Sequence, residues 1–519
     1  MQILNSMENK LQFFTQHVWI SLIFLCISGI ILRIFYFPFD LPITLDGLFY
    51  FWFAYDISIT GNLPMEYYIE NDGWPIFLGF WLQIFHFDNF LEYVTFQRSI
   101  SSILSIITII PIFLLCKKFF NQKYALIAAA IFVFEPRLIQ NSLLGITEPL
   151  YLLLISISLV LFFSQNKKFI FISFAIVALA TIVRSEGLFL FIAFSILYVL
   201  KFRTNKEMIV KYALAIIIFI LVLLPSVSYR VDNYGHDGIL DRIIRSTDEI
   251  KLSSNIGSSD IGSSDWISFL INGLTNTIKF LGWDLIPIFI IFVPIGFVLI
   301  IKRRNFKELS IILILFMMSG PAWFAYLNNS DTRFLFILYP LFCILSVFTI
   351  EKFANKIKKN NIIIVILILG ILISSILFLE YKKIDYELER DSFEIAGIVS
   401  NIASGINSST EISKYMKTAE INKNWPKLPS LNTDNSIPLE IKIISDKSLI
   451  SIKSFILDSK SKGLTHLVID EESENKKLME IFYNFEKYSF LEKVYDSKDD
   501  NRKLGVKIFK INFDKLINQ

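Results

Sequence analysis

The sequence is organised around residues 41–64, which read LPITLDGLFYFWFAYDISITGNLP. This stretch follows the first long apolar run of the chain and contains Asp46, with Tyr50 four residues later. One helical turn places these two side chains on the same face. An acid at the edge of a bilayer is costly unless it has a function. We therefore consider Asp46 as a reacting group, with a helix N-cap formed by Thr44 or Asp46 as the structural alternative.

The composition identifies the class of protein. Hydrophobic residues make up 54% of the 519 residues, 51 residues are Phe, and the mean hydropathy is +0.55. These values indicate an integral membrane protein. The net charge of only +3 does not suggest a nucleic-acid partner. The four histidines are scattered and form no metal-binding motif with the cysteines, so we expect no divalent metal and no cofactor.

Eleven apolar runs approach the roughly 20 residues that are needed to cross a bilayer. They lie at about 17–37, 96–116, 122–138, 148–164, 168–184, 186–200, 208–228, 279–301, 308–326, 333–350 and 361–380. We interpret the first run as a retained signal anchor, because no small-residue cleavage site follows it. The sequence therefore predicts a mainly α-helical, polytopic membrane protein with about 11 transmembrane helices.

Basic residues predict the orientation of these spans. If the N-terminus is cytoplasmic, five inner loops carry seventeen Lys and Arg residues, within 117–123, 167–168, 201–211, 302–307 and 352–359. The first outer loop, 38–95, carries eight acids and no Lys or Arg. With an odd number of spans, the C-terminal part is then predicted to be extracytoplasmic.

The polar segments divide the chain into two predicted domains. Residues 1–384 hold the spans and two outer loops, 38–95 and 229–278. In the first loop, aromatic stretches at 46–59 and 74–87 predict helices that lie on the membrane surface. The second loop includes the Gly/Ser-rich piece NIGSSDIGSSDW, which is either a lid or a disordered insertion.

The last part of the chain, 385–519, is charged and polar and contains alternating helix-like and strand-like runs. Predicted strands lie at 439–445, 464–470, 488–496 and 504–512, and a loop-rich insert at 405–438. These runs predict a small α/β domain on the outer face of the membrane.

Several ionisable residues stand at the predicted outer ends of spans. They are Glu135, Arg137, Glu148, Arg184, Glu186 and Arg333. Each also has a structural explanation: Glu148 suits a helix start, Arg184 and Glu186 can neutralise each other, and Arg333 can snorkel to the headgroups. Their location on one side favours a function, because an acid together with several arginines suits a phosphate-bearing substrate.

Four motifs occur in an order that resembles a known family. They are TLDGLFY (44–50), EPRLIQNSLLGITEPLYLLL (135–154), ATIVRSEGLFLF (180–191) and DTRFLFILYPLF (331–342). The chain resembles the GT-C glycosyltransferases over residues 15–380, in particular the protein O-mannosyltransferase and lipid A aminoarabinose transferase group. This resemblance implies transfer of a sugar from a polyprenyl-phosphate carrier to a protein, lipid or glycan acceptor outside the cytoplasm, at the surface of the lipid bilayer.

The resemblance also implies roles for individual residues. Asp46 matches the catalytic acid of the first loop and would accept the acceptor's proton, with inversion at the sugar carbon. The residues expected to bind substrate are Tyr50 and Trp74 as stacking surfaces, Glu148 near sugar or acceptor hydroxyls, Arg184 and Arg333, with Arg137, near the phosphate, and Glu186.

This chain also departs from the family pattern. Gly47 follows Asp46, where protein mannosyltransferases usually carry Asp-Glu, and neither a WWDYG motif nor a DxD pair is present. We therefore expect a metal-independent monosaccharide transferase. An oligosaccharyltransferase-like enzyme, a transporter and a non-catalytic membrane protein remain alternatives.

Overall fold

The computed structural model describes residues 17–65, 68–69, 71–241, 263–326, 331–356, 360–402, 406–408, 415–416, 418–419, 422, 443–444, 452–461, 463–473 and 475–517. The chain forms two compact units. The first contains Met1–Phe37, Leu63–Phe80 and Gln97–Leu379, and the second contains Pro38–Asn62, Trp81–Phe96 and Glu380–Gln519.

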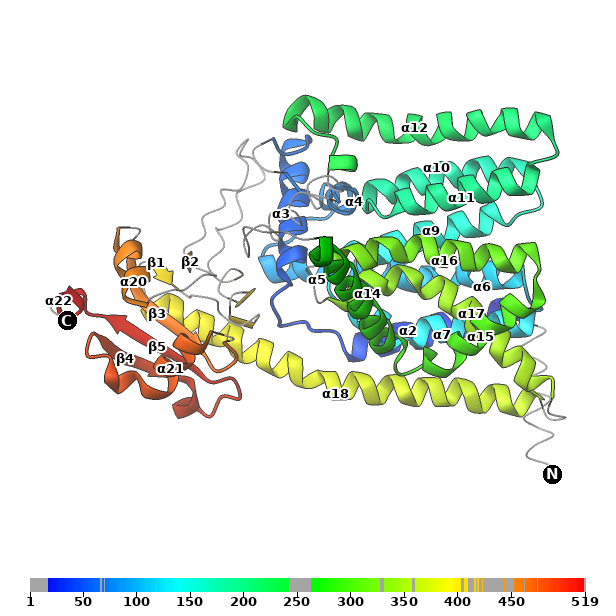
Figure 1. The fold of residues 1–519 in the computed structure, drawn as a ribbon. Coiled ribbons are helices and arrows are strands. Elements are labelled where there is room, and N and C mark those ends of the chain that lie inside the picture. Colours follow the sequence, from blue (N-terminus) through cyan, green and yellow to red (C-terminus); the bar gives the residue numbers. More distant parts are fainter. Residues whose placement is uncertain are drawn as a thin grey trace. The chain divides into compact units, whose positions relative to one another are not determined.

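The first unit is built from apolar helices (Figure 1). They are α2 (Val18–Phe35), α6 (Ile109–Lys117), α7 (Gln122–Phe134), α8 (Pro136–Ser142), α9 (Glu148–Phe162), α10 (Lys167–Val183), α11 (Gly187–Phe202), α12 (Lys206–Tyr234), α14 (Ser263–Leu285), α15 (Phe289–Arg303), α16 (Phe306–Ala325), η1 (Thr332–Leu338) and α17 (Tyr339–Ala354). Three more, α4 (Gly73–Leu82), α5 (Phe90–Ile107) and α18 (Asn360–Ile402), contribute to both units.

The lengths of these helices confirm a multi-pass membrane protein. Among the described residues, six helices are long and apolar enough to cross a membrane, or seven if the bent pair α14–α15 is one span. Four predicted spans between 122 and 200 correspond to α7, α9, α10 and α11, which have only 13 to 17 residues. The total of 11 spans therefore stays a prediction.

Asparagine caps begin four helices of the first unit. The side chains of Asn121, Asn166, Asn205 and Asn305 accept hydrogen bonds from backbone N–H groups in the first turns of α7, α10, α12 and α16. Such caps satisfy donors that have no partner within the helix. The polar residues between apolar runs thus define where these helices start.

The predicted span 279–301 is wrong as one continuous helix. α14 ends at Leu285 and α15 begins at Phe289, with a bend of 114° between them. Pro287 lies in the break, where its ring and missing N–H prevent a continuous helix. The preceding polar loop is also shorter than predicted, because α12 and α14 extend into it; most of the Gly/Ser-rich piece lies outside the described residues.

The second unit includes α3 (Leu45–Thr60), the helix predicted from the opening stretch. Thr44 caps its start, and Gly61 ends it in the left-handed conformation with φ of 70°. Every residue from Phe51 to Ile57 is buried. A helix on a membrane surface buries only one face, so the burial of α3 is that of a core helix.

The tail of the second unit contains the predicted small sheet (Figure 1). Its elements are β1 (Ile406–Ser408), β2 (Ile443–Ile444), α20 (Ile452–Lys460), β3 (Leu464–Asp470), α21 (Lys476–Asn484), η2 (Phe485–Lys487), β4 (Leu491–Asp496), η3 (Ser497–Asp500), β5 (Val506–Ile511) and α22 (Phe513–Ile517). The strand order is β2-β1-β3-β5-β4, in which β1 pairs in parallel with β2 and β3, and β5 pairs antiparallel with β3 and β4. The α/β class is confirmed, whereas β1 lies in the predicted loop-rich insert.

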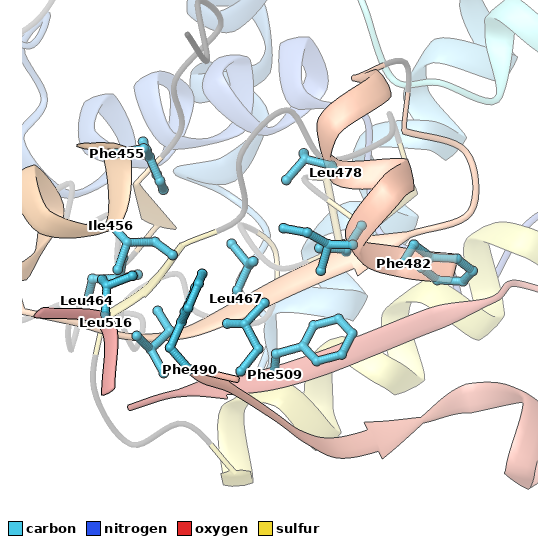
Figure 2. Packing of buried hydrophobic residues seen from close by; sticks show 13 residues of the cluster. Phe455, Ile456, Leu464, Leu467, Leu478, Phe482, Phe490, Phe509 and Leu516 are labelled. Carbon is cyan, nitrogen blue, oxygen red and sulfur yellow. The ribbon is translucent and has the colours of Figure 1, made fainter. Parts of the chain in front are cut away.

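Both faces of this sheet carry a hydrophobic core. Figure 2 shows one core, in which Leu467 and Phe509 of the sheet lie with Ile456 of α20 and Leu478 of α21. The other core includes Val468, Val506 and Ile508 with Ile395 and Val399, which belong to the end of α18. Burial on both faces explains why Leu467, Val468 and Ile469 are consecutive apolar residues in β3.

Candidate functional site

Three of the predicted site residues form one ion-pair network in the first unit. Glu148 is the first residue of α9, Arg184 follows the end of α10, and Glu186 precedes α11. Arg184 Nη1 lies 2.7 Å from Glu148 Oε1, and Arg184 Nη2 lies 2.7 Å from Glu186 Oε1. Consecutive helices α9, α10 and α11 run alongside each other (Figure 1), so these helix ends meet. We call Glu148, Arg184 and Glu186 the buried triad.

The turn that carries Arg184 depends on a close backbone approach. A Cβ atom on Gly187 would lie 2.6 Å from Thr181 Oγ1 and 2.9 Å from Thr181 Cα. These distances are shorter than real Cβ contacts, so only glycine fits without a shift of the backbone. Gly187 therefore allows α10 and α11 to be joined tightly, with Arg184 and Glu186 on either side of one residue.

The buried triad is shielded from solvent and carries a net negative charge if both acids are ionised. Glu148 is 3% exposed, Arg184 6% and Glu186 8%. Thr147 adds a hydroxyl 3.1 Å from Arg184 Nη1. Arg184 and Glu186 thus neutralise each other, as the structural explanation for these two residues predicts. A phosphate at this site would therefore compete with Glu148 and Glu186 for the Arg184 guanidinium.

Tyr151, which the sequence reasoning missed, lies one turn after Glu148 on α9. It is 0% exposed, and among the described residues its hydroxyl has no hydrogen-bond partner. Tyr151 also interacts electrostatically with Glu186 and Arg184. Its spacing of i+3 from Glu148 was the available signal, since residues three apart share a helix face.

A second buried ion pair, between Asp72 and Arg230, was not predicted. Arg230 Nε lies 2.9 Å from Asp72 Oδ2, and Arg230 Nη2 binds Asp72 Oδ1 in a bidentate arrangement. Their side chains are only 4% and 1% exposed. Arg230 Nη1 also donates to the Asp237 carbonyl oxygen at 3.2 Å. A charge within the apolar helix α12 was the signal that could have identified Arg230.

The residues after Asp72 contact both chain segments that carry the buried triad. A Cβ atom on Gly73 would lie 2.7 Å from the Val183 backbone nitrogen, so the start of α4 packs directly against the end of α10. Trp74 Nε1 donates to the Gly145 carbonyl oxygen at 3.1 Å, just before α9. The Asp72–Arg230 pair therefore holds a segment that supports the buried triad.

Trp74 itself is 0% exposed, and its indole N–H is used by the bond to Gly145. A stacking surface must be open to the sugar. In this structure the Trp74 ring is packed in the interior, and its stacking on substrate stays a prediction. The sequence indicates that an aromatic residue lies near the predicted site, but only the packing shows whether its ring is buried or accessible.

Arg137 lies at the break between α14 and α15. Its Nη2 donates to the Trp283 carbonyl oxygen at 2.8 Å, its Nε donates to the Ile286 carbonyl oxygen at 3.2 Å, and its guanidinium lies 5.1 Å from the Phe378 ring centroid. A cation that binds the last carbonyls of a helix stabilises that end. The structure thus gives Arg137 a structural task in place of the predicted phosphate contact.

Arg333 lies at the start of η1 beside Asp331. Its Nε is 2.6 Å from Asp331 Oδ2, and its backbone N–H donates to Asp331 Oδ1 at 2.9 Å. The Arg333 side chain is 30% exposed, compared with 7% for Arg184. Solvent therefore reaches Arg333 much more readily than Arg184.

Asp46 and Tyr50 belong to the second unit. Asp46 is exposed in the first turn of α3, and Tyr50 is half-buried one turn later. The helix cap is Thr44, whose Oγ1 accepts from the Gly47 N–H at 3.3 Å. Of the two capping residues considered from the sequence, Thr44 is the one observed, so capping does not explain Asp46.

Comparisons with known proteins agree with this architecture. The family described as dolichyl-phosphate-mannose-protein mannosyltransferase matches residues 75–229, which include the buried triad. No curated protein sequence matches the chain.

Solved structures with the same fold cover nearly the whole chain. The Archaeoglobus fulgidus oligosaccharyltransferase in complex with Zn and sulfate has a TM-score of 0.55 and 13% identity, over 89% of this chain and 68% of that chain. The oligosaccharyltransferase AglB from Archaeoglobus fulgidus in complex with an inhibitory peptide and a dolichol-phosphate has a TM-score of 0.54 and 11% identity, over 90% of this chain and 71% of that chain. ArnT from Cupriavidus metallidurans bound to undecaprenyl phosphate has a TM-score of 0.52 and 11% identity, over 94% and 98%.

Proposed function

We propose, from the GT-C fold of this multi-pass membrane protein, that it transfers a sugar from a polyprenyl-phosphate carrier to an acceptor at the extracytoplasmic membrane face. One observation carries the proposal. The segment matched by the mannosyltransferase family contains a buried network of two carboxylates and one guanidinium, Glu148, Arg184 and Glu186. Buried charges in membrane proteins are expensive and mark functional sites.

The proposed donor is a single sugar on a lipid phosphate. ArnT was solved with undecaprenyl phosphate and AglB with a dolichol-phosphate, which supports a polyprenyl-phosphate carrier. This chain spans 98% of ArnT but only 68–71% of the oligosaccharyltransferase structures. Transfer of one sugar, such as a mannosyl group, is therefore our first proposal. An oligosaccharyltransferase-like reaction is the second candidate, because the oligosaccharyltransferase has a slightly higher TM-score and was solved with an acceptor peptide.

The proposed reaction is a metal-independent displacement with inversion. Asp46 accepts the proton of an acceptor hydroxyl while that oxygen forms a bond to the anomeric carbon of the sugar. The bond from this carbon to the phosphate oxygen breaks at the same time, and the lipid phosphate leaves with the electron pair. The acceptor is a protein, a lipid or a glycan that presents a hydroxyl group.

The other residues bind the two substrates in this proposal. Arg333 donates hydrogen bonds to the departing phosphate, and Arg184 does so after it exchanges one carboxylate of the buried triad. Glu148 and Glu186 then accept hydrogen bonds from sugar hydroxyls, and Tyr50 offers a ring surface. Trp74 Nε1 and two nitrogens of Arg137 hold backbone carbonyls, so this proposal gives neither residue a contact with substrate.

The test is the Asp46→Asn variant. Asn keeps the size of Asp but cannot accept the proton, so turnover should fall by about 10²–10⁴-fold with nearly unchanged folding and donor binding. Purified protein is incubated with a panel of polyprenyl-phosphate sugars, and released polyprenyl phosphate is measured. Asp40→Asn, another exposed acid of the same loop, is the matched control and should keep full turnover.

A capping variant separates folding from chemistry. Thr44→Ala removes the observed cap and should lower stability by about 1 kcal/mol while leaving the chemical step intact. If Asp46→Asn retains turnover within a few-fold of wild type, Asp46 is not the base. If no donor of the panel releases lipid phosphate with the wild type, the transporter or non-catalytic alternative is favoured.

The proposed orientation has its own test. A reporter that is active only in the cytoplasm, fused after Gln519, should be silent because the C-terminal part is proposed to be extracytoplasmic. An active reporter would invert the topology and would place the proposed site on the wrong side of the membrane for this reaction.

A further inference from the structure

A cavity of about 410 Å³ lies at the end of the helices remote from the buried triad. Its lining comes from the end of α9, the start of α10, the end of α11 and the start of α16. The buried triad lies at the opposite ends of α9 and α10. The cavity volume falls within the range of small-molecule sites, roughly 300–1,000 Å³. We call this space the lysine cavity.

Three lysines and a largely apolar surface line the lysine cavity. The lysines are Lys167, Lys201 and Lys307, and no acidic residue is among the lining residues. The other lining residues are Phe162, Phe163, Ser164, Gln165, Ile170, Leu197, Phe202, Phe306 and Ser310. An apolar cavity with a few positive groups suits an amphipathic anion. The apolar part of such a ligand contacts apolar side chains, and its anionic group contacts the ammonium groups.

Two acids lie near these lysines, Glu308 close to Lys307 and Glu207 close to Lys167, but each of these acids also neutralises a second cation. Glu308 lies 3.5 Å from Arg303, and Glu207 is paired with Lys211. Lys307 Nζ donates to the Lys118 carbonyl oxygen, a neutral acceptor. The cavity therefore has a net positive rim.

Helix dipoles do not account for this positive character. α10 and α16 begin at the cavity, whereas α9 and α11 end there. The partial positive charges of two helix starts are offset by the partial negative charges of two helix ends. The three ammonium groups are thus the features that select an anion.

The surroundings of the cavity favour a lipid over a small soluble anion. Phe169, Leu200 and Phe306 are between 43% and 47% exposed and belong to the three helices that carry the lysines. Exposed apolar residues on such helices contact acyl chains in a bilayer. The five basic loops predict this end of the helices to be cytoplasmic, and that leaflet carries anionic lipids.

We propose that the lysine cavity binds the phosphate-bearing headgroup of an anionic lipid from the cytoplasmic leaflet. Lys167, Lys201 and Lys307 donate to the phosphate, and the acyl chains follow the exposed apolar residues of α10, α11 and α16. This site is separate from the proposed donor site, since it lies at the opposite ends of the helices. Its occupancy does not depend on whether the protein transfers a sugar.

Native mass spectrometry of the full-length protein in a neutral detergent tests this proposal. The protein is titrated with phosphatidylglycerol, with phosphatidylcholine as the zwitterionic comparison, and glycerol 3-phosphate is added as a competitor. We expect saturable binding of phosphatidylglycerol, at least several-fold tighter than that of phosphatidylcholine. Excess glycerol 3-phosphate should not displace it, because the headgroup alone lacks the acyl contacts.

The test variant replaces Lys167, Lys201 and Lys307 with Gln and should bind phosphatidylglycerol roughly 100-fold more weakly, because each lysine near anionic lipid contributes about 1 kcal/mol. The matched control replaces three exposed lysines of the same predicted side, Lys168, Lys206 and Lys352, and should bind as the wild type. Ser164→Trp fills the cavity without removing charge and should also weaken binding.

Three results would overturn the proposal. An equal loss of phosphatidylglycerol binding in the test and control variants would show that the lipid is attracted to the basic face in general and does not bind at a specific site. Equal binding of both lipids would show that the phosphate charge is not recognised. Displacement by glycerol 3-phosphate would assign the cavity to a small soluble anion. The midpoint of thermal unfolding is recorded for every variant, and the single variant Lys201→Gln replaces the triple variant if the latter does not fold.

Discussion

The first unit contains two Glu–Arg–Glu groups with very different surroundings. In the buried triad, Arg184 lies 2.7 Å from each of Glu148 and Glu186, and its side chain is 7% exposed. In the second group, which we call the exposed triad after its arginine, Arg303 lies 3.5 Å from Glu308 and 3.4 Å from Glu351. The side chains of Arg303, Glu351 and Glu308 are 43%, 23% and 14% exposed. The two groups have the same composition but not the same burial.

The contrast between the two triads indicates that burial, rather than residue type, decides how strongly an ion pair affects stability. An exposed pair contributes about 0–1 kcal/mol, because water screens the attraction and the side chains lose freedom. A buried pair has lost its hydration, so removal of one partner leaves an uncompensated charge that costs about 3–5 kcal/mol. The exposed triad is what we expect of a basic loop that determines membrane topology. The buried triad is what we expect of a functional site.

The largest effect is expected for Arg184→Gln. This change leaves Glu148 and Glu186 buried without their cation, so it should destabilise the protein by about 4 kcal/mol. Thermal unfolding in detergent measures it with a thiol-reactive dye, since Cys116 and Cys343 are free and buried in the folded protein.

A neutral triad separates charge from packing. If both glutamates are also replaced with Gln, no buried charge remains, and most of the lost stability should return. If the neutral triad stays as unstable as Arg184→Gln, packing rather than charge holds this region, and the comparison with the exposed triad loses its electrostatic basis.

A somewhat smaller effect is expected for Asp72→Asn. Arg230 then remains buried with an amide in place of a carboxylate, so stability should fall by about 3 kcal/mol. Because Gly73 and Trp74 contact the segments of the buried triad, turnover in the sugar-transfer assay should fall as well. Gln83→Ala, which removes a hydrogen bond at the other end of the same stretch, is the control and should have little effect on turnover. Normal turnover in Asp72→Asn would contradict a positioning role for this pair.

The exposed triad provides the contrasting prediction. Arg303→Gln should change stability by less than about 1 kcal/mol, although it also removes a cation–π contact at 5.0 Å from the Phe348 ring centroid. The same thiol-reactive unfolding assay measures it, and the small effect should shrink further at high salt. A loss as large as that of Arg184→Gln would break the comparison, because exposure would then not predict the strength of the ion pair.

The smallest effect is expected for His466 in the second unit. Burial, and to a lesser extent Lys510, lowers the pKa of His466 below its ordinary value of 6.5. The unfolded chain therefore takes up a proton more readily than the folded chain, and stability should fall as the pH decreases through about 6.5. We expect this pH effect on stability in strand β3, in which His466 lies opposite Lys510 of β5 in the sheet.

Hydrogen exchange of the β3 amides measures this effect at pH 7.5 and 5.5 in wild type and His466→Gln. Intrinsic exchange cancels when the two proteins are compared at the same pH. Protection in the wild type should decline more on acidification than in His466→Gln. The same decline in both proteins would show that burial of His466 is not coupled to its titration.

Properties that depend on neighbouring residues could be predicted from the sequence alone. Apolar runs predicted the helices, and LTHLVID predicted β3 with its observed bounds, Leu464–Asp470. Glu148, Arg184 and Glu186 could be predicted to lie together, because consecutive helices that reverse direction bring their ends to one side. These predictions succeeded since hydrophobic pattern, helix caps and span order are local or topological features.

Which charges are buried, and which partners they have, could be learned only from the three-dimensional packing. Arg230 pairs with Asp72, which is 158 positions away, and Arg137 holds carbonyls of the break after α14. Trp74 proved to be a buried packing residue although its sequence surroundings suggested an open surface. Desolvation depends on what surrounds a side chain in three dimensions, and those neighbours come from distant parts of the chain. Residue type therefore identifies candidates for a site, and packing decides which of them are paired, buried or accessible.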